Sequence, residues 1–239
     1  MSLHYLVTGA RGGVGSAVLE QLRAAGEERV TAWDLPEVDV TDPQCVAEAL
    51  ARAVGERGPV DRLIHVAGTL AEDSALHPDA AALERCVGVN LGGVVTVCSR
   101  VAQEMVARGE GAIVVVSSNS AAVPRAGMAA YGASKAAATS WAKTLGLECA
   151  PHGVRVNVVS PGSTNTPMLQ GMWPEGSEPR EQLRGVIAGA PERFRLGIPL
   201  GRVAEPADIA AACLWLASPA ARHITMHDLR VDGGATLDA

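Results

Sequence analysis

A glycine-rich turn near the N-terminus constrains the fold of this chain more than any other feature. The apolar run 3–7 leads into the turn, its glycines include Gly9, Gly13 and Gly15, and a helical pattern follows. Glycines at a strand-to-helix turn let backbone N–H groups approach a pyrophosphate, and the helix N-terminus adds partial positive charge. The spacing departs from the common G-x-G-x-x-G motif, so the turn by itself is weak support for a dinucleotide site.

An acidic residue stands where a dinucleotide-binding fold needs one. A second apolar segment, 29–33, ends at Asp34, about 20 residues after Gly15. At that distance an aspartate accepts hydrogen bonds from the hydroxyls of the adenosine ribose. A surface aspartate after a strand would account for Asp34 but not for its distance from the glycines. The pair of features predicts that the chain binds NAD.

Strand-like and helix-like segments alternate along the chain. This alternation predicts an α/β fold, a Rossmann-type doubly wound domain whose parallel sheet is flanked by helices on both faces. With 239 residues, 48% of them hydrophobic, the chain suits one large core, so we expect a single NAD-binding catalytic domain over residues 1–239. We expect strands at 3–8, 29–34, 61–66, 111–117, 153–159 and 228–231, and helices at 14–25, 42–56, 80–108, 129–150 and 205–217.

The segment 162–200 differs in composition from the rest of the chain. It is rich in glycine, proline and charged residues, with Met168, Met172, Trp173 and Phe194 scattered through it. Long insertions of this kind often cover binding sites. We expect it to form a mobile flap over the substrate.

Tyr131 and Lys135 have the spacing that places two side chains on one face of a helix. The ordinary pKa of tyrosine, about 10, is too high for a base at neutral pH. An ammonium about 4 Å away would stabilise the phenolate by roughly 4 kcal/mol, enough to bring the pKa of the phenol to about 7. Ser118, just after the apolar run 112–116, can donate a hydrogen bond to a substrate oxygen. An ordinary amphipathic helix has the same spacing, but the N-terminal turn favours the catalytic interpretation.

These features together resemble the short-chain dehydrogenase/reductase family. Its pattern is Thr-Gly-x-x-x-Gly-x-Gly, a mid-chain Asn, then Ser, Tyr-x-x-x-Lys and a Pro-Gly loop. The match covers essentially the whole chain in the right order, and it consists of the run Thr8 to Gly15, Asn90, Ser118, Tyr131, Lys135, Pro161, Gly162 and Thr166. The resemblance implies an NAD-dependent dehydrogenase that assembles as a homotetramer through its C-terminal strand and the helices at 80–108 and 129–150.

The resemblance also implies roles for individual residues. Asn90 would join the catalytic residues by holding a water that links Lys135 to solvent, and Asp39 would approach the adenine. His65 stands where the family has an asparagine that steadies the central sheet. The implied cofactor contacts are Gly9, Arg11, Gly13, Val14, Gly15, Asp34, Asp39, Ala67, Gly68, Tyr131, Lys135, Pro161, Thr164 and Thr166.

Four segments carry a closer likeness. The stretches 124–128, 158–164, 196–201 and 223–234 resemble the 2,3-dihydro-2,3-dihydroxybenzoate dehydrogenases of catechol siderophore synthesis. In that reaction a ring alcohol of a cyclohexadiene acid loses hydride to NAD⁺, and the resulting ketone tautomerises to an aromatic product. Close relatives act on trans-2,3-dihydro-3-hydroxyanthranilate, which carries an amine in place of one hydroxyl and belongs to antibiotic biosynthesis. The sequence leaves both substrates open.

A substrate of either kind is a carboxylate, and Arg125 is the residue that we expect to bind it. It lies between the strand that ends near Ser118 and the catalytic helix, in a loop shaped by Pro124 and Gly127. A guanidinium fork matches a carboxylate with two parallel hydrogen bonds. Met128 would pack against the ring, and Ser118 and Tyr131 would contact the reacting alcohol. A solvated arginine in a polar loop is the alternative; Arg195 or Arg193 would then be the next candidates.

Two other functions remain possible from the sequence. A regulator that senses NAD could keep the fold without catalysis, but it would be expected to have lost Tyr131, Lys135 or Ser118. An NADPH-dependent ketoacyl reductase would place a basic residue rather than Asp34 at the ribose, and only Arg11 in the glycine-rich turn supports it.

Composition restricts the partners and the location. The net charge of −6 argues against nucleic acid or an anionic membrane, and we identify no apolar stretch of the ~20 residues that span a bilayer. The five cysteines are dispersed, as expected for reduced thiols in a cytoplasmic enzyme. His223 and His227 are four residues apart but lack a third ligand, so we assign no metal.

Overall fold

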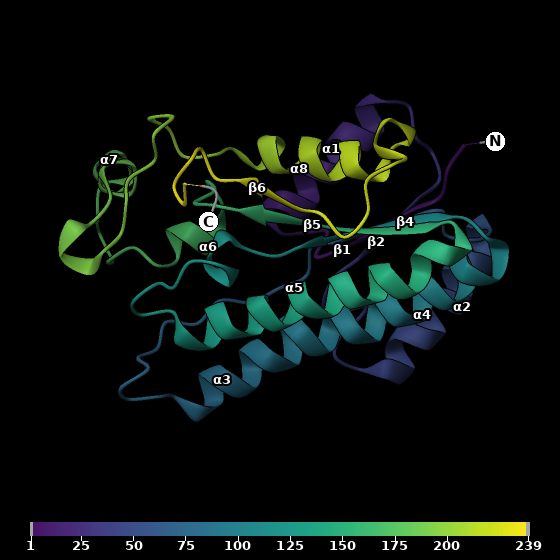
Figure 1. Ribbon diagram of the computed structural model, residues 1–239, viewed down its shortest axis with the longest axis horizontal. Coiled ribbons are helices and arrows are strands. Elements are labelled where there is room, and N and C mark those ends of the chain that lie inside the picture. Colours follow the sequence, from purple (N-terminus) through teal and green to yellow (C-terminus); the bar gives the residue numbers. More distant parts are fainter. Residues whose placement is uncertain (1, 238–239) are drawn as a thin grey trace.

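The computed structural model describes residues 2–237, and a six-stranded parallel sheet forms its centre (Figure 1). The strands lie in the order β2-β1-β3-β4-β5-β6, and every neighbouring pair is parallel. This is the predicted doubly wound α/β fold. The strands are β1 (Tyr5–Thr8), β2 (Val30–Trp33), β3 (Arg62–His65), β4 (Gly111–Val116), β5 (Val154–Pro161) and β6 (Asp228–Val231).

Helices cover both faces of the sheet. In Figure 1 helices α1 and α8 lie above it, and α2, α4 and α5 lie below. All six predicted strands and all five predicted helical regions are present, with ends shifted by one or two residues. The helices are α1 (Gly13–Ala24), α2 (Pro43–Arg57), α3 (Ala80–Cys86), α4 (Gly93–Arg108), α5 (Ala129–Cys149), α6 (Pro167–Gln170), α7 (Pro179–Ala188) and α8 (Pro206–Ala217), with short 3₁₀ turns at Asn119–Ala121, Ala150–His152, Pro191–Arg193 and Pro219–Ala221.

Successive strand residues point to opposite faces, so the sheet carries two apolar layers. Leu6 and Leu63 belong to the layer under α2, α4 and α5, whereas their chain neighbours Val7 and Ile64 belong to the layer under α1 and α8. All four side chains have an exposed fraction of 0%. Burial on both faces explains why the strands read as continuous apolar runs rather than as alternating patterns.

The predicted helix at 80–108 is continuous but irregular. A π-helical segment, Val87–Gly92, separates α3 from α4, and Asn90 lies within it. Single π turns inside helices occur frequently at functional sites. The sequence pattern did not predict this interruption, because one extra residue in a turn leaves the apolar spacing almost unchanged.

The same run is also apolar enough to resemble a membrane span, which the sequence analysis did not anticipate. Residues Ala80–Arg108 form a helical run that is long and apolar enough to cross a bilayer, although 39% of its most apolar 18-residue stretch is buried inside the protein. Helix α4 packs against α2, α5, β3 and β4. We therefore interpret it as a core helix with an additional apolar face.

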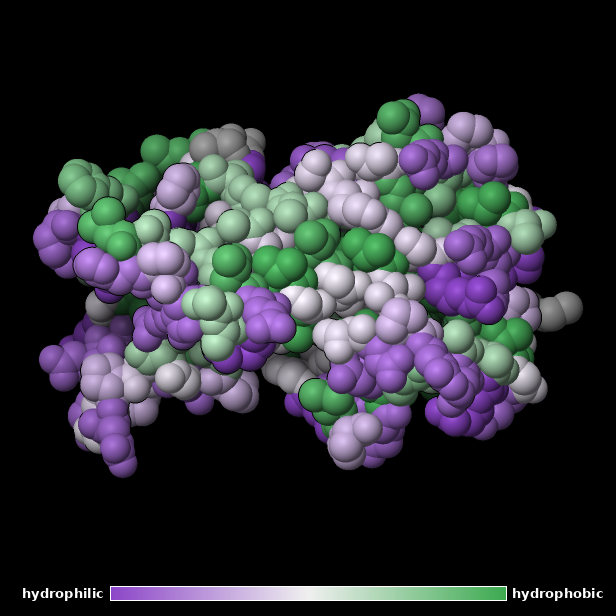
Figure 2. Space-filling model, turned by 90° about the horizontal axis from the view of Figure 1, so that it is seen from below, coloured by the Kyte–Doolittle hydropathy of each residue, from purple (hydrophilic) through white to green (hydrophobic). Residues whose placement is uncertain are grey.

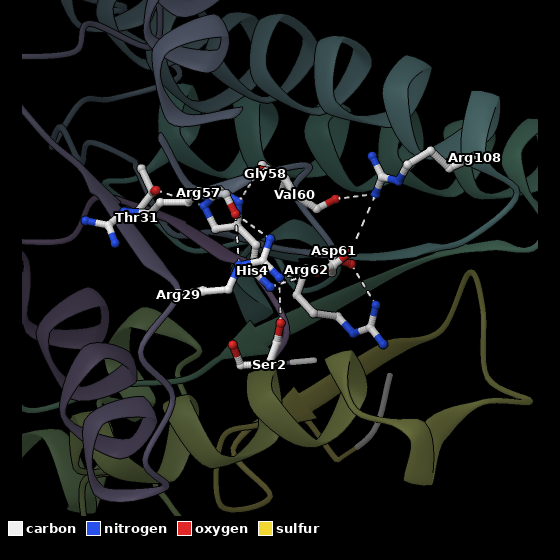
Figure 3. A network of polar contacts seen from close by, with 10 residues as sticks. All are labelled: Ser2, His4, Arg29, Thr31, Arg57, Gly58, Val60, Asp61, Arg62 and Arg108. Carbon is white, nitrogen blue, oxygen red and sulfur yellow. Dashed lines mark hydrogen bonds and ion pairs between the residues drawn. The ribbon is translucent and has the colours of Figure 1, made fainter. Parts of the chain in front are cut away.

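A buried polar network closes the amino-terminal edge of the sheet (Figure 3). The His4 backbone N–H donates to Asp61 at 2.7 Å, and the His4 ring contacts the Gly58 carbonyl at 2.8 Å and the Thr31 hydroxyl at 2.9 Å. Arg108 lies 3.8 Å from the Asp61 carboxylate and donates to a main-chain carbonyl. Burial lowers the pKa of His4. The network ties three strands and two helices together at the opposite edge from the site described below.

His65 occupies the centre of the sheet as a neutral side chain. The Thr8 hydroxyl accepts hydrogen bonds from the backbone N–H groups of Val66 and Ala67, so it donates its own proton to Nδ1 of His65 at 3.0 Å. His65 therefore carries its proton on Nε2, which is buried and has no hydrogen-bond partner within residues 2–237. Burial and the charge of Lys135 lower the pKa of His65 to about 3. His65 therefore helps to hold the loop after β3 in place, through its hydrogen bond with the Thr8 hydroxyl.

Candidate active site

A cavity of about 490 Å³ opens at the carboxyl ends of the central strands. Parallel α/β sheets bind ligands at this edge, in the crevice where the strand order reverses. Every predicted site residue lines it except Gly15 and Asn90. The predicted residues in its wall are Gly9, Arg11, Gly13, Val14, Asp34, Asp39, Ala67, Gly68, Ser118, Arg125, Met128, Tyr131, Lys135, Pro161, Thr164 and Thr166.

The glycine-rich turn is packed too tightly for larger side chains. Gly9 has a φ of +63°, and a Cβ there would lie 2.7 Å from the backbone nitrogen of Ala67. A Cβ at Gly13 would lie 2.7 Å from Cγ2 of Thr166, across the cavity wall. Because these positions are glycines, no side chain covers the backbone where the start of α1 faces the cavity, as binding of a pyrophosphate requires.

Gly15 has a different role from the one predicted. It does not line the cavity, and a Cβ there would overlap the carbonyl oxygen of Gly9. Gly15 therefore allows the first turn of α1 to pack against the glycine-rich turn. Its contribution to cofactor binding is indirect.

Asp34 ends β2 with its carboxylate held in place. The backbone N–H groups of Arg11 and Leu35 donate to it at 2.7 and 2.8 Å, and Asp34 lines the cavity. The Arg11 guanidinium turns away to Glu37, with which it forms an ion pair at 2.7 Å. Asp39 is exposed on the same wall, and it accepts hydrogen bonds from the backbone and hydroxyl of Thr41 at 2.8 and 2.7 Å.

Ser118 is oriented toward Tyr131 by a neighbour that sequence reasoning missed. Its hydroxyl oxygen accepts hydrogen bonds from the backbone N–H and the hydroxyl of Ser120 at 3.2 and 2.9 Å. The Ser118 proton is then free to be donated, and Ser118 is hydrogen-bonded to the phenol of Tyr131. All three side chains are at least 90% buried, with exposed fractions of 7 to 8%. The local signal for Ser120 was its position two residues after Ser118.

The effect of Lys135 on Tyr131 differs from our expectation. Burial is the largest influence and raises the pKa of Tyr131, while the hydrogen bond from Ser118 acts in the opposite direction. The Lys135 Nζ lies 5.9 Å from the centre of the tyrosine ring and donates to the Val116 carbonyl at 3.0 Å. Burial also lowers the pKa of Lys135 to about 8. The structure therefore does not show the expected lowering of the Tyr131 pKa by Lys135.

Asn90 holds the loop after β3 against the catalytic helix. Its side-chain oxygen accepts from the Thr69 backbone N–H at 2.8 Å, and its amide donates to the Thr69 carbonyl and to the Ser134 hydroxyl, both at 2.9 Å. Both amide protons are thus used within the protein. Gly68 lets Asn90 and Lys135 approach, because a Cβ there would lie 3.1 Å from a polar atom of each. The predicted water bound by Asn90 stays a prediction.

The substrate end of the cavity contains Arg125, Met128 and a second arginine, Arg195. Arg195 comes from the predicted flap and donates to the Ser163 hydroxyl at 2.9 Å. The short helices α6 and α7 lie in this flap, and its residues Met168, Met172 and Leu196 also line the cavity. The structure therefore places this segment in the cavity wall. Its role as a mobile flap over the substrate stays a prediction.

Asp73 caps the catalytic helix from a distant loop. Helix α5 has no capping side chain of its own at Met128, and Asp73 accepts from the Ala130 backbone N–H at 3.0 Å. The Asp73 N–H donates to the Gly127 carbonyl at 3.1 Å. The two residues of the cap are 57 positions apart, so no local sequence pattern predicts it. Asp73 joins the loop after β3 to the loop that carries Arg125.

The comparisons with known proteins agree with this geometry. The sequence pattern of a family described as "Enoyl-(Acyl carrier protein) reductase" matches residues 8–236. The chain is a short-chain dehydrogenase/reductase. It is 41% identical to the vibriobactin-specific 2,3-dihydro-2,3-dihydroxybenzoate dehydrogenase of Vibrio cholerae, over 98% of this chain and 95% of that protein. It is also 41% identical to the 2,3-dihydro-2,3-dihydroxybenzoate dehydrogenase of Bacillus subtilis, over 97% and 95% of the two chains.

A solved relative shows the same fold with a dinucleotide. The 3-ketoacyl-(acyl-carrier-protein) reductase from Brucella melitensis, complexed with NADH, superposes with a TM-score of 0.84 at 27% identity, over 98% of each chain. The glycine-rich turn and Asp34 of the present chain fit a nicotinamide dinucleotide, because the bare backbone suits the pyrophosphate and the carboxylate suits the ribose. The enzyme is therefore an oxidoreductase that uses a nicotinamide dinucleotide.

The Ser118–Tyr131 hydrogen bond predicts a pH dependence. Oxidation of an alcohol needs the Tyr131 phenolate, so kcat/KM should rise with pH as the tyrosine loses its proton. The Ser118 hydrogen bond lowers the pKa of Tyr131. Ser118→Ala should therefore move the rising limb of the kcat/KM profile to higher pH, in addition to lowering its plateau.

Two variants control this measurement. Ser140→Ala removes a hydroxyl from the exposed side of the same helix and should leave the profile unchanged. Tyr131→Phe should lose turnover by roughly 10²–10⁴-fold and still bind NAD with normal affinity. A profile that stays in place in Ser118→Ala, or near-normal turnover in Tyr131→Phe, would contradict these roles.

Proposed function

We propose that this dehydrogenase oxidises 2,3-dihydro-2,3-dihydroxybenzoate to 2,3-dihydroxybenzoate with NAD⁺, in the synthesis of a catechol siderophore or a related secondary metabolite. The identity of 41% to two dehydrogenases of that substrate, over nearly the full length of the chain, carries the proposal. The buried serine, tyrosine and lysine support it, because they are the residues that oxidation of an alcohol needs.

The residues have distinct roles in the proposed reaction. Ser118 orients the hydroxyl of the ring, and the Tyr131 phenolate takes its proton. Lys135, whose Nζ lies 5.9 Å from the centre of the tyrosine ring, would hold the nicotinamide ribose. NAD⁺, when bound along the wall from Asp34 to Lys135, supplies the acceptor for the hydride. The ketone product tautomerises to an aromatic ring, and aromatisation makes the oxidation effectively one-way.

The charges around the cavity favour a hydroxyl over an amine on the ring. The acidic residues that line the cavity are Asp34 and Asp39, and both lie at the ribose end. The substrate end carries Arg125 and Arg195 instead. An ammonium group beside the substrate carboxylate would meet two cations there, and among residues 2–237 no acidic side chain lines this end of the cavity. The alternative, oxidation of trans-2,3-dihydro-3-hydroxyanthranilate to 3-hydroxyanthranilate, is therefore the weaker hypothesis.

The other two alternatives find less support. A non-catalytic NAD sensor has no need for the buried arrangement of Ser118, Ser120 and Tyr131. An NADPH-dependent ketoacyl reductase needs a free cation at the ribose, but Arg11 is paired with Glu37. The free cysteines suit a reducing compartment, which supports a cytoplasmic enzyme.

The exposed face of α4 and α5 supports the expected homotetramer. Figure 2 shows this side of the molecule, where apolar residues form a band across the middle. Val87 before α4 and Leu147 on α5 are 38% and 63% exposed. We propose that this face, together with β6 at the edge of the sheet, joins four copies with dihedral symmetry, an arrangement common among homo-oligomers.

The substrate proposal is tested by following NADH formation with a panel of dihydro-hydroxy ring acids. The dihydroxybenzoate precursor should give the highest kcat/KM, and the dihydro-hydroxyanthranilate should be slower because its ammonium faces Arg125 and Arg195. If the dihydro-hydroxyanthranilate reacted faster than the dihydroxybenzoate precursor, it would become the favoured substrate. Inactivity toward the whole panel would reject both.

We also expect a preference for NAD over NADP. Asp34 can accept hydrogen bonds from both ribose hydroxyls, whereas the 2′-phosphate of NADP would bring negative charge against its carboxylate. The preference is measured as the ratio of kcat/KM for the two cofactors. Asp34→Ala should narrow it mainly by weakening NAD binding, while Asp42→Ala, at the cap of α2, should leave it unchanged. Equal kcat/KM in the wild type would disprove the role of Asp34.

Light scattering at micromolar protein should give four times the mass of one chain. Leu147→Glu places a charge on the exposed side of α5 and should shift the population to smaller species. Glu148→Gln, the neighbouring exposed position, should not. A wild-type protein with the mass of one chain would disprove the assembly.

A further inference from the structure

Three arginines from two separate segments lie close enough to influence one another: Arg125 and Arg195 line the cavity, and Arg193 is exposed beside it. Arg125 lies in the loop before α5, and Arg193 and Arg195 lie in the flap after α7. Arg193 donates to the Ala126 carbonyl at 3.1 Å, which joins the flap directly to the substrate loop. Arg195 is half-buried, lines the cavity and donates to Ser163.

These three cations lack a counter-charge in the part of the chain that the structure describes. None of them forms an ion pair among residues 2–237. Burial and repulsion from Arg125 and Arg193 lower the pKa of Arg195. Asp232 is the acid that acts on Arg125, but its carboxylate accepts hydrogen bonds from Asn119, Gly234 and Thr236.

Unpaired cations that face one another across a cavity predict an anionic ligand. The two segments are held against each other by one arginine–carbonyl hydrogen bond while their charges repel. An anion bound between Arg125 and Arg195 would attract both guanidinium groups and so offset their mutual repulsion. A planar carboxylate has two oxygens and about four acceptor sites, so it can engage both guanidinium groups at once.

We propose that the substrate carboxylate closes the flap by binding to Arg125 of the loop and Arg195 of the flap at the same time. Arg193 is a positioning residue: its hydrogen bond to the Ala126 carbonyl fixes where the flap lies against the loop. Ser163 occupies one N–H group of Arg195 and so aims the rest of its guanidinium into the cavity. Substrates without a carboxylate leave the flap open. The proposal rests on the proposed function only for the statement that the natural ligand is a ring acid.

Binding to the enzyme–NADH complex tests the bridge without depending on turnover. The probes are 2,3-dihydroxybenzoate, benzoate, and catechol, which lacks the carboxylate, each measured by calorimetric titration. Loss of a buried charged partner of this kind weakens binding by about 30-fold or more. Arg125→Ala and Arg195→Ala should each reduce the affinity for benzoate by at least that factor and leave catechol binding unchanged. The double variant should lose less than the product of the two factors, because both arginines act on one carboxylate.

Matched variants separate the bridge from a general effect on folding. Arg184→Ala removes an exposed arginine of α7 and should bind every probe like the wild type. Arg195→Lys keeps the charge without the fork and should recover part of the benzoate affinity. Hydrogen exchange of residues 179–198 should slow when benzoate binds and should not respond to catechol. Arg193→Ala should abolish this slowing while it weakens benzoate binding less than Arg195→Ala does.

Several outcomes would overturn the bridge. Equal affinity for benzoate and catechol, or normal benzoate affinity in Arg195→Ala, would show that the carboxylate binds elsewhere. Slowed exchange with catechol would show that the flap closes without an anion. If the wild type fails to oxidise the dihydroxybenzoate precursor but binds benzoate through Arg125 and Arg195, the proposed substrate is wrong and the bridge stands.

Discussion

The packing of α5 against the end of β4 is the contact on which the rest of the site depends. The Ser117 hydroxyl, at the end of β4, lies 2.7 Å from the Thr139 hydroxyl and 3.3 Å from the Lys135 carbonyl, both on α5. All of these groups are buried, so the hydrogen bonds fix the helix in one position along the strand. That position brings Tyr131 to Ser118 and Lys135 to the Val116 carbonyl. Asp73 holds the first turn of the same helix, which makes the catalytic side chains part of a rigid frame.

The acidic and the basic residues of the cavity come from different parts of its wall. Its acidic residues lie where the adenosine ribose is expected, and its unpaired arginines lie where the ring acid is expected. This distribution of charge supports the proposal that a dinucleotide and a substrate carboxylate bind at different parts of the cavity. The arginines come from a loop and from the flap, two segments that pack on the core less than the strands do. Binding of the substrate can thus be coupled to the arrangement of the flap, while the catalytic helix stays in place.

The sequence predicted the fold and most of the cavity wall because both depend on local patterns. Alternating apolar segments identified the strands and helices, and the spacing from Gly15 to Asp34 predicted a dinucleotide site whose residues, apart from Gly15, line the cavity. Its errors concern effects that act through space. The pattern could not show that Gly15 packs against Gly9 rather than lining the cavity, or that the Lys135 ammonium donates to the Val116 carbonyl. The cap supplied by Asp73 joins distant segments, and no local pattern contains it.

By itself, the sequence determined which chemistry the chain carries: a bare glycine turn, an acidic residue at the ribose, and a serine, tyrosine and lysine in the order of a dehydrogenase. These are properties of residue type and spacing, which exist before the chain folds. The tertiary structure alone decided how the side chains influence one another, because burial raises the pKa of Tyr131 and Arg195 forms no ion pair among residues 2–237. It also decided that the flap reaches Arg125, since that contact depends on where two distant segments meet at the carboxyl edge of the sheet.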